Sequence, residues 1–124
     1  KPIFKIYGTD YPTADGTCVR DYIHVSDIAE IHYKVLKAIN KKKESKILNC
    51  GYGIGVSVNE SVKEFKKYAN KNLKILKLSK RKGDMVKITA DNKNLKKFIN
   101  WKPSSNKLSI IVKSCIRWEK RTNR

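Results

Sequence analysis

The sequence predicts one domain of the α/β class. Short apolar segments bounded by Gly, Pro and Asp are each followed by a longer segment in which apolar residues recur at helical spacing. With 124 residues, the chain is near the usual size of a domain and can bury one modest core. We see no repeat, low-complexity segment or internal linker. Residues 1–124 are therefore expected to form a single mixed α/β domain.

The first half of the chain is expected to contain three strands and a helix. Residues 3–7 read as a strand, 8–20 as a polar loop, and 21–25 as a second strand. Asp27 and Glu30 have a D-x-x-E spacing close to that of a capping box, which predicts a helix start. After a solvated connection at 41–45, residues 46–50 read as a third strand. The buried face of the first helix is expected to hold Ile28, Ile31, Val35, Ala38 and Ile39.

The second half is expected to contain three helices and one strand. Ser57-Val58-Asn59-Glu60 is a capping box that starts a helix, and residues 73–78 read as a strand. Asp91 is placed to cap a short helix, and a last helix follows Pro103. The apolar residues expected to be buried are Val58, Val62, Phe65 and Ala69 in the first of these helices, Leu95, Phe98 and Ile99 in the second, and Leu108, Ile111, Val112, Cys115 and Trp118 in the last.

The charge of the chain favours anionic ligands. Lys and Arg number 29 against 11 Asp and Glu, a formal net charge of +18. A basic nucleic-acid-binding module is the alternative from a different class of protein. The lysines are nevertheless spread over every segment, and aromatic residues are not interleaved with basic ones as in a stacking platform. Nucleic acid is therefore not the partner that we expect.

Several other features bound the protein class. Cys18, Cys50 and Cys115 lie far apart without metal-ligand spacing, which indicates free thiols in a reducing compartment, the cytoplasm. His24 and His32 belong to no HExxH or CxxC pattern, so no metal site is expected. We see no signal peptide and no apolar run near the ~20 residues of a membrane span. The chain opens on "KPIFKIYG" without an initiator Met, which suggests a fragment.

Two patterns resemble catalytic or cofactor motifs but are interpreted structurally. The loop "GYGIG" at 51–55 is G-x-G-x-G rather than the dinucleotide fingerprint, and the next strand ends near Leu78 without an acidic residue. A tight turn is the favoured interpretation. Tyr33 and Lys37 have the Tyr-x-x-x-Lys spacing of hydride-transfer enzymes. That spacing is common by chance in a lysine-rich chain, and Tyr33 is flanked by expected core positions. No catalytic residue is therefore assigned.

Arg20, Arg81 and Asp84 carry the chemistry of an anion site. Arg20 follows the Gly-containing loop, and Arg81 and Asp84 lie in "KRKGD", just after a predicted strand. A guanidinium group can hold a phosphate through two hydrogen bonds, whereas an ammonium group cannot. A carboxylate beside such groups can accept hydrogen bonds from sugar hydroxyls. The alternative is two surface ion pairs of little energetic value, Arg20–Asp21 and Arg81–Asp84. We prefer the anion site.

Four motifs in order resemble those of the UDP-glucose 4-epimerases, within the extended short-chain dehydrogenase/reductase family. They are "YGTDYPTADGTCVRDYIHVSDIAEIH", "ILNCGYGIGVSV", "KRKGD" and "INWKP", and they cover nearly the whole chain. The resemblance is to the small C-terminal UDP-sugar-binding domain, with the Rossmann half absent. In the family, that other half binds NAD and carries the catalytic Ser and Tyr-x-x-x-Lys.

The resemblance implies an NAD-dependent isomerase that interconverts UDP-glucose and UDP-galactose through a 4-keto sugar. This chain alone would then be inactive and would bind no cofactor itself. Its expected partners are the UDP-sugar, the missing Rossmann domain and, in a homodimer, a second copy. Another UDP-sugar epimerase or dehydratase of the same family is the nearer alternative.

By analogy with the family, the residues expected to bind the substrate are Arg20 and Arg81 at the diphosphate, Asp84 at the uridine ribose, Tyr7 along the uracil, and Tyr22 and Val58 lining the nucleotide pocket. Two departures stand out. Lys80 replaces the first Arg of an Arg-Arg pair and so loses the planar fork. Ile88 and Thr89 stand where the family often has an aromatic residue, which leaves room for a different sugar.

Overall fold

The computed structural model describes residues 3–42, 45–69 and 73–122, and all statements below concern these residues. The elements follow one another in the order β1 (Ile3–Tyr7), β2 (Val19–Arg20), α1 (Val25–Lys42), β3 (Val56–Ser57), α2 (Val58–Tyr68), β4 (Lys74–Leu78), β5 (Lys87–Ile88), α3 (Lys93–Ile99) and α4 (Leu108–Thr122).

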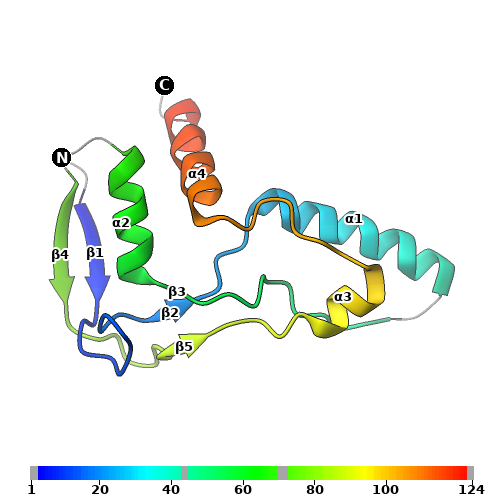
Figure 1. The fold of residues 1–124 in the computed structure, drawn as a ribbon, viewed down its shortest axis with the longest axis horizontal. Coiled ribbons are helices and arrows are strands. Elements are labelled where there is room, and N and C mark those ends of the chain that lie inside the picture. Colours follow the sequence, from blue (N-terminus) through cyan, green and yellow to red (C-terminus); the bar gives the residue numbers. More distant parts are fainter. Residues whose placement is uncertain (1–2, 43–44, 70–72, 123–124) are drawn as a thin grey trace.

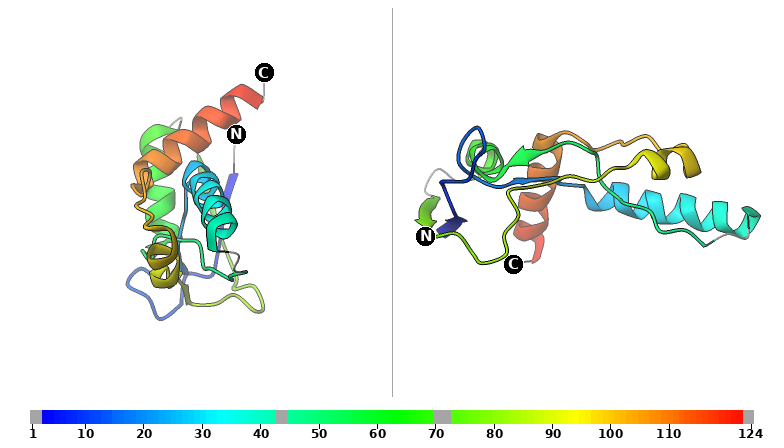
Figure 2. Two further views of the ribbon diagram at one scale, coloured as in Figure 1. Left: turned by 90° about the vertical axis from the view of Figure 1, so that its right-hand side faces the viewer. Right: turned by 90° about the horizontal axis from the view of Figure 1, so that it is seen from below.

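The molecule is elongated, with a small sheet between two groups of elements (Figure 1). The strands β1 and β4 lie at one end, next to α2, and α4 stands beside α2. The helices α1 and α3 pack together at the other end, where α1 projects away from the sheets in the right-hand view of Figure 2. None of the described helices is long and apolar enough to cross a membrane.

Two separate sheets organise the strands. In the first, β1 and β4 are parallel, in a register that pairs Ile3 with Lys74 and Tyr7 with Leu78. In the second, β2 is central, antiparallel to β3 and parallel to β5, so that Arg20 is opposite both Val56 and Ile88. Because β1 and β4 run in the same direction, the loops that follow them leave from the same edge.

The main apolar cluster lies at the α1–α3 end. Ile31 of α1, Leu95 of α3, Tyr52 and Trp101 are buried there. The rings of Tyr52 and Trp101 stack with centroids 6.1 Å apart and an angle of 9° between their planes. The predicted face of the first helix is confirmed, since Ile31 is buried and Ile28, Val35, Ala38 and Ile39 are half-buried.

The α/β class and the strands at 3–7 and 73–78 are confirmed, although the second strand begins at Lys74. The strands predicted at 21–25 and 46–50 are wrong. Residues 21–24 have no partner strand, because the His24 N–H donates instead to the Tyr52 hydroxyl (3.0 Å), and α1 already begins at Val25. Residues 46–50 are irregular. The short strands β2, β3 and β5 were not predicted.

The predicted capping residues had different outcomes. The capping box is confirmed: Ser57 Oγ accepts a hydrogen bond from the Glu60 N–H (3.0 Å), and the Glu60 carboxylate accepts one from the Ser57 N–H (2.7 Å). The Asp27 cap is wrong, because Asp27 lies inside the first turn of α1 and its side chain is buried. For α3 the N-cap is Asn92, without a side-chain cap bond, and Asp91 instead accepts from the Lys93 N–H (3.1 Å).

Two helix predictions need correction at their ends. In α4, Val112 is buried, but Cys115 and Trp118 are exposed, so the predicted apolar face is buried only in its first half. The helix α1 continues through Lys42, so the predicted connection at 41–45 is shorter than expected, and 43–44 lie outside the described residues.

Candidate functional site

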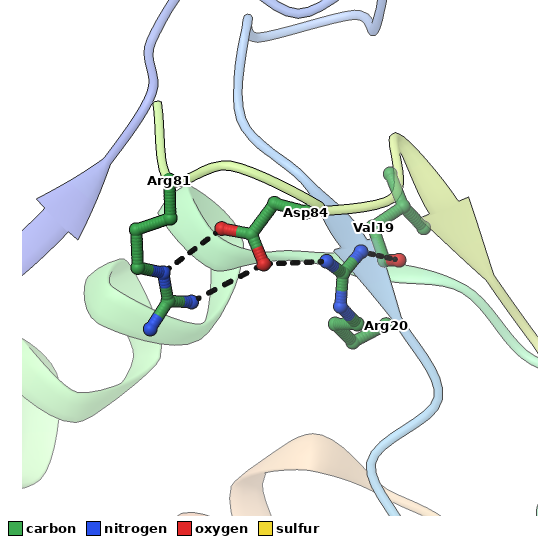
Figure 3. A network of polar contacts seen from close by, with 4 residues as sticks. All are labelled: Val19, Arg20, Arg81 and Asp84. Carbon is green, nitrogen blue, oxygen red and sulfur yellow. Dashed lines mark hydrogen bonds and ion pairs between the residues drawn. The ribbon is translucent and has the colours of Figure 1, made fainter. Parts of the chain in front are cut away.

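Arg20 and Arg81 meet at the carboxylate of Asp84. Nε of Arg81 lies 2.9 Å from Oδ2 of Asp84, and Nη2 of Arg81 lies 3.4 Å from Oδ1. From the other side, Nη2 of Arg20 lies 3.7 Å from the same Oδ1 (Figure 3). Residues predicted from two separate motifs therefore share one carboxylate. Of the two surface ion pairs of the alternative interpretation, Arg81–Asp84 is present, whereas Arg20 pairs with Asp84 and not with Asp21.

A tight turn after β4 presents Arg81 and Asp84 on the same side. The Asp84 N–H donates to the Arg81 carbonyl (3.2 Å), and Gly83 between them has φ +86°. A Cβ at Gly83 would meet nothing within 4 Å, so it is the left-handed backbone, and not crowding, that favours glycine here. The hydrogen bond from Arg81 to Asp84 raises the pKa of the Arg81 guanidinium.

Arg20 is more enclosed than Arg81. It ends the central strand β2, and its Nη1 donates to the Val19 carbonyl (2.9 Å). The side chain is 25% exposed, compared with 61% for Arg81. A half-buried, hydrogen-bonded guanidinium is held in place before any ligand arrives, which lowers the entropy lost on binding.

Tyr7 is brought to the same place by the parallel pairing of β1 with β4. Tyr7 is the last residue of β1, opposite Leu78, and the Gly8 N–H donates to the Leu78 carbonyl (2.8 Å). The guanidinium carbon of Arg81 lies 4.6 Å from the centroid of the Tyr7 ring, which is a cation–π distance. Four of the six predicted binding residues therefore form one connected group: Tyr7, Arg20, Arg81 and Asp84.

Tyr22 and Val58 lie next to this group along the chain. Tyr22 follows Arg20 by two residues and lines a small cavity of about 20 Å³ with Tyr52 and Ile54. Val58 begins α2 directly after β3, and its N–H donates to the Cys18 carbonyl (2.9 Å). Both residues therefore adjoin the β2–β3 pair that carries Arg20, although each is fixed by contacts of its own.

An open cavity of about 370 Å³ adjoins Arg20. Its lining includes Arg20, Cys50, Ile88 and Thr89. Ile88 of β5 is the pairing partner of Arg20 of β2. Ile88 and Thr89, which stand where the family often has an aromatic residue, therefore line the same cavity as Arg20. Small aliphatic and hydroxyl side chains there leave this space open.

Asp21 has a structural role that the sequence did not reveal. Its carboxylate accepts backbone hydrogen bonds from Tyr52 (3.0 Å), Gly53 (2.8 Å) and Ala90 (3.1 Å). Asp21 therefore joins three loops and does not form the ion pair with Arg20 that the alternative interpretation included. A Cβ at Gly51 would lie 2.6 Å from Oδ2 of Asp21, so close packing explains this glycine. No local signal could have shown it, since the partners lie 31 to 69 residues away.

The remaining candidates have partners other than the Asp84 carboxylate. Nζ of Lys80 is 3.0 Å from Asp10 Oδ2, and this hydrogen bond lowers the pKa of the Asp10 carboxyl. Lys37 Nζ lies 4.3 Å from the ring centroid of Tyr33, and that tyrosine is 58% exposed on α1. Within 3–42, 45–69 and 73–122, no group of three or more His, Cys, Asp or Glu side chains could hold a metal ion.

The chain is similar in sequence to known epimerases. The model of the NAD dependent epimerase/dehydratase family matches residues 4–51. Over 120 residues, the chain is 38% identical to a UDP-glucose 4-epimerase of Azospirillum brasilense, covering 97% of this chain and 34% of that protein. It is 42% identical over 121 residues to a probable UDP-arabinose 4-epimerase of Oryza sativa, covering 96% of this chain and 29% of that one.

A solved structure agrees with these relatives. The UDP-glucose 4-epimerase of Stenotrophomonas maltophila, crystallised with NAD and formylated UDP-arabinopyranose, superposes with a TM-score of 0.92 at 32% identity. The match covers 100% of this chain and 37% of that one. The chain thus spans about a third of the length of the relatives it matches. In sequence and in fold, it is similar to the C-terminal third of UDP-glucose 4-epimerases of the NAD dependent epimerase/dehydratase family.

Proposed function

We propose that this chain is the UDP-sugar-binding part of a UDP-sugar 4-epimerase, an isomerase, and that UDP-glucose and UDP-galactose are its substrates. The observation that carries the proposal is the group in which Arg20 and Arg81 flank Asp84. Two guanidinium groups, one from strand β2 and one from the turn after β4, on either side of one point, suit the two phosphates of a diphosphate.

The other members of the group suit the nucleoside. The Asp84 carboxylate can accept hydrogen bonds from ribose hydroxyls, and the Tyr7 ring at the end of β1 offers a flat face for the uracil. Tyr22 and Val58 would line the nucleotide pocket on the β2–β3 side. The charge of +18 also favours the approach of an anionic substrate.

NAD is expected to be held by residues outside this chain. The glycine loop at 51–55 does not suit a dinucleotide, because the space beside Gly51 is filled by Asp21 and Ala90, and the space beside Gly55 is filled by Val19. When bound, NAD would remove a hydride from C4 of the sugar and return it to the opposite face. The residues of this chain would hold the UDP end throughout.

Firm contacts at the UDP end and few at the hexose suit a reaction in which the 4-keto sugar must turn over inside the site. Binding energy held remote from the reacting carbon retains the intermediate without fixing its orientation. In this chain, Arg20, Arg81 and Asp84 form one charged group. The adjoining cavity has Arg20 and Asp21 on one part of its lining and uncharged residues, among them Cys50, Ile88, Thr89 and Ala90, on the rest.

A UDP-pentose is the second candidate substrate. The identity to the probable UDP-arabinose 4-epimerase, 42%, is as high as that to the glucose enzymes. Ile88 and Thr89 also line the adjoining cavity without an aromatic ring, which leaves room for a different sugar. A panel of UDP-glucose, UDP-N-acetylglucosamine and UDP-arabinose, assayed on a full-length protein, would rank the substrates by kcat/KM.

The compartment and the assembly form part of the same proposal. Cys18, Cys50 and Cys115 are free thiols, which suits the reducing cytoplasm. We also expect a homodimer, by analogy with the family.

The binding proposal is tested by isothermal titration calorimetry of UDP into the 124-residue chain. Replacing Arg20 or Arg81 by Ala should weaken UDP binding about ten- to a hundredfold, because a charge-assisted hydrogen bond is lost. Replacement by Lys should restore only part of the affinity, since the planar fork is lost. Lys41→Ala, on the exposed surface of α1, removes an equal charge and is the control.

Two outcomes would contradict the proposal. If Lys41→Ala weakens UDP binding as much as the arginine variants, the general positive field is responsible. If the chain instead binds arbitrary duplex DNA with a steep salt dependence and does not bind UDP, the nucleic-acid alternative is correct.

A further inference from the structure

Before any ligand binds, the place between the two arginines is taken by a carboxylate of the chain itself. Figure 3 shows Asp84 flanked by Arg81 on one side and Arg20 on the other. In the described part of the chain, the ion pairs recorded for this carboxylate run to those two guanidinium groups, at 2.9 Å and 3.7 Å. Asp84 therefore stands where an anionic ligand would have to bind.

We propose that Asp84 makes the site select a diphosphate that carries a hydroxylated sugar and reject free inorganic diphosphate. This inference rests on the proposed function, since it concerns the same two arginines. An anion that approaches Arg20 and Arg81 either displaces the Asp84 carboxylate or lies beside it. Both outcomes cost free energy, because like charges a few ångströms apart repel and a displaced carboxylate loses its charge-assisted hydrogen bonds.

A nucleoside diphosphate can offset this cost and a bare diphosphate cannot. The ribose next to the phosphates offers hydroxyl groups that donate to a carboxylate, so Asp84 can exchange guanidinium donors for hydroxyl donors. Inorganic pyrophosphate near neutral pH is strongly anionic and keeps few protons, so it repels the carboxylate and offers it few donors in exchange. The same residue would thus attract the correct ligand and repel a smaller competitor, which is selection by an unfavourable contact.

Burial makes the difference larger at Asp84 than at a surface ion pair. The side chain of Asp84 is 18% exposed, so water can replace its lost partners only in part. In the neighbouring pair of Lys80 and Asp10, the carboxylate is 75% exposed and would be rehydrated at little cost. Lys80 and Arg81 are adjacent in the loop after β4, but only the Asp84 carboxylate is shielded enough for the loss of its partners to be costly.

The experiment measures the binding of UDP, 2′,3′-dideoxyuridine diphosphate and inorganic pyrophosphate to the 124-residue chain and to Asp84→Asn by calorimetry. The substitution keeps the shape and removes the charge. Pyrophosphate should bind Asp84→Asn about three- to tenfold more tightly than it binds the unchanged chain. UDP should gain less or lose affinity, and the preference for UDP over its dideoxy analogue should decrease.

Glu64→Gln is the matched control. Glu64 is 14% exposed and pairs with Lys67 at 2.6 Å on α2, so this variant removes the same charge from a similarly shielded ion pair. It should leave all three affinities unchanged. Asp84→Ser provides a second variant, and the melting temperature of each variant verifies folding.

The outcomes separate the two proposals. If arginine substitution abolishes UDP binding but Asp84→Asn leaves pyrophosphate binding unchanged, the selection by Asp84 is wrong and the proposed function stands. A variant that loses only UDP affinity, without a gain for pyrophosphate, also overturns it, because Asp84 would then merely bind ribose. If the unchanged chain binds no UDP, the proposed function fails. The affinities of the unchanged chain and of Asp84→Asn for pyrophosphate then still show whether Asp84 hinders the binding of an anion to Arg20 and Arg81.

Discussion

The phenolic oxygen of Tyr52 donates a hydrogen bond to Oδ2 of Asp27 at 2.6 Å, and both side chains are buried. The same carboxylate accepts bonds from Ser104, through N–H (3.2 Å) and Oγ (2.6 Å), and from the Ser105 N–H (3.0 Å). Asp27 thereby joins the start of α1 to the glycine loop and to the segment before α4. This junction therefore holds together three segments that lie far apart along the chain.

Asp27→Asn should destabilise the fold. The amide keeps the shape but offers a single acceptor oxygen to four donors, and its NH2 group would face two of them. We expect a loss of about 2–3 kcal/mol in the free energy of unfolding, the range for hydrogen bonds to a buried charge. Urea denaturation followed by circular dichroism measures it. Asp10→Asn, in an exposed ion pair with Lys80, should leave the urea midpoint nearly unchanged, and equal effects of the two variants would argue against this junction.

The Asp27 carboxyl also gives a prediction for acidic pH. Burial alone would raise its pKa, but the hydrogen bonds from Ser104, Tyr52 and Ser105 outweigh burial and hold the pKa below its ordinary value of 3.8. Stability from this group is therefore present above about pH 3.8 and is lost as the pH falls through the lowered pKa. Urea midpoints of the unchanged chain and of Asp27→Asn should converge at acidic pH. A difference that stays constant down to pH 2 would contradict the prediction.

Tyr52 predicts a loss of stability at alkaline pH. Burial and the hydrogen bond to Asp27 raise the pKa of Tyr52 from 10.0 to about 12. Because the folded state holds this proton more tightly, its contribution is full below pH 10 and is lost between pH 10 and about 12. The stability difference between the unchanged chain and Tyr52→Phe should therefore shrink over that range. The phenylalanine variant cancels contributions from other titrating groups, and a difference that grows with pH would show the wrong sign.

The isolated chain is predicted to have no epimerase activity. It spans about a third of its relatives, and we expect the NAD site and the general base to lie in the remainder. Purified chain with UDP-galactose and added NAD should yield no UDP-glucose by chromatography. A chimera in which this chain replaces the matching third of the Azospirillum brasilense enzyme should be active, unless Arg20 or Arg81 is changed to Ala. Conversion by the isolated chain would refute the prediction.

Exposed apolar side chains on α1 predict self-association. Val25 is 71%, Tyr33 58% and Leu36 60% exposed, and the last two share a helix face. Such surface is expected to be covered by the other half of the enzyme or by a second copy. Sedimentation should show concentration-dependent association that Leu36→Lys reduces. A strictly monomeric chain at high concentration, which also fails to bind a dye specific for apolar surface, would contradict the idea.

Features whose partners lie close along the chain could be predicted from the residue pattern. The Ser57–Glu60 capping box and the apolar face of α1 were both predicted correctly. Each depends on hydrogen bonds or periodicity within a few residues, so local chemistry fixes it. The α/β class follows from the same local patterns. The residue types of the candidate site were also legible, because two arginines stand out in a chain where lysine is the usual cation.

The partners of several polar side chains, and the exposure of part of α4, follow only from the packing of distant segments. That packing turned Asp27 from an expected cap into a buried acceptor for residues up to 78 positions away, and Asp21 into a junction for Tyr52 and Ala90. It left Trp118 exposed and brought Arg20 to Asp84. A carboxylate accepts from whichever donors packing delivers to it, and loop closure over such distances costs little extra free energy. The sequence pattern therefore names the polar groups, and packing chooses their partners.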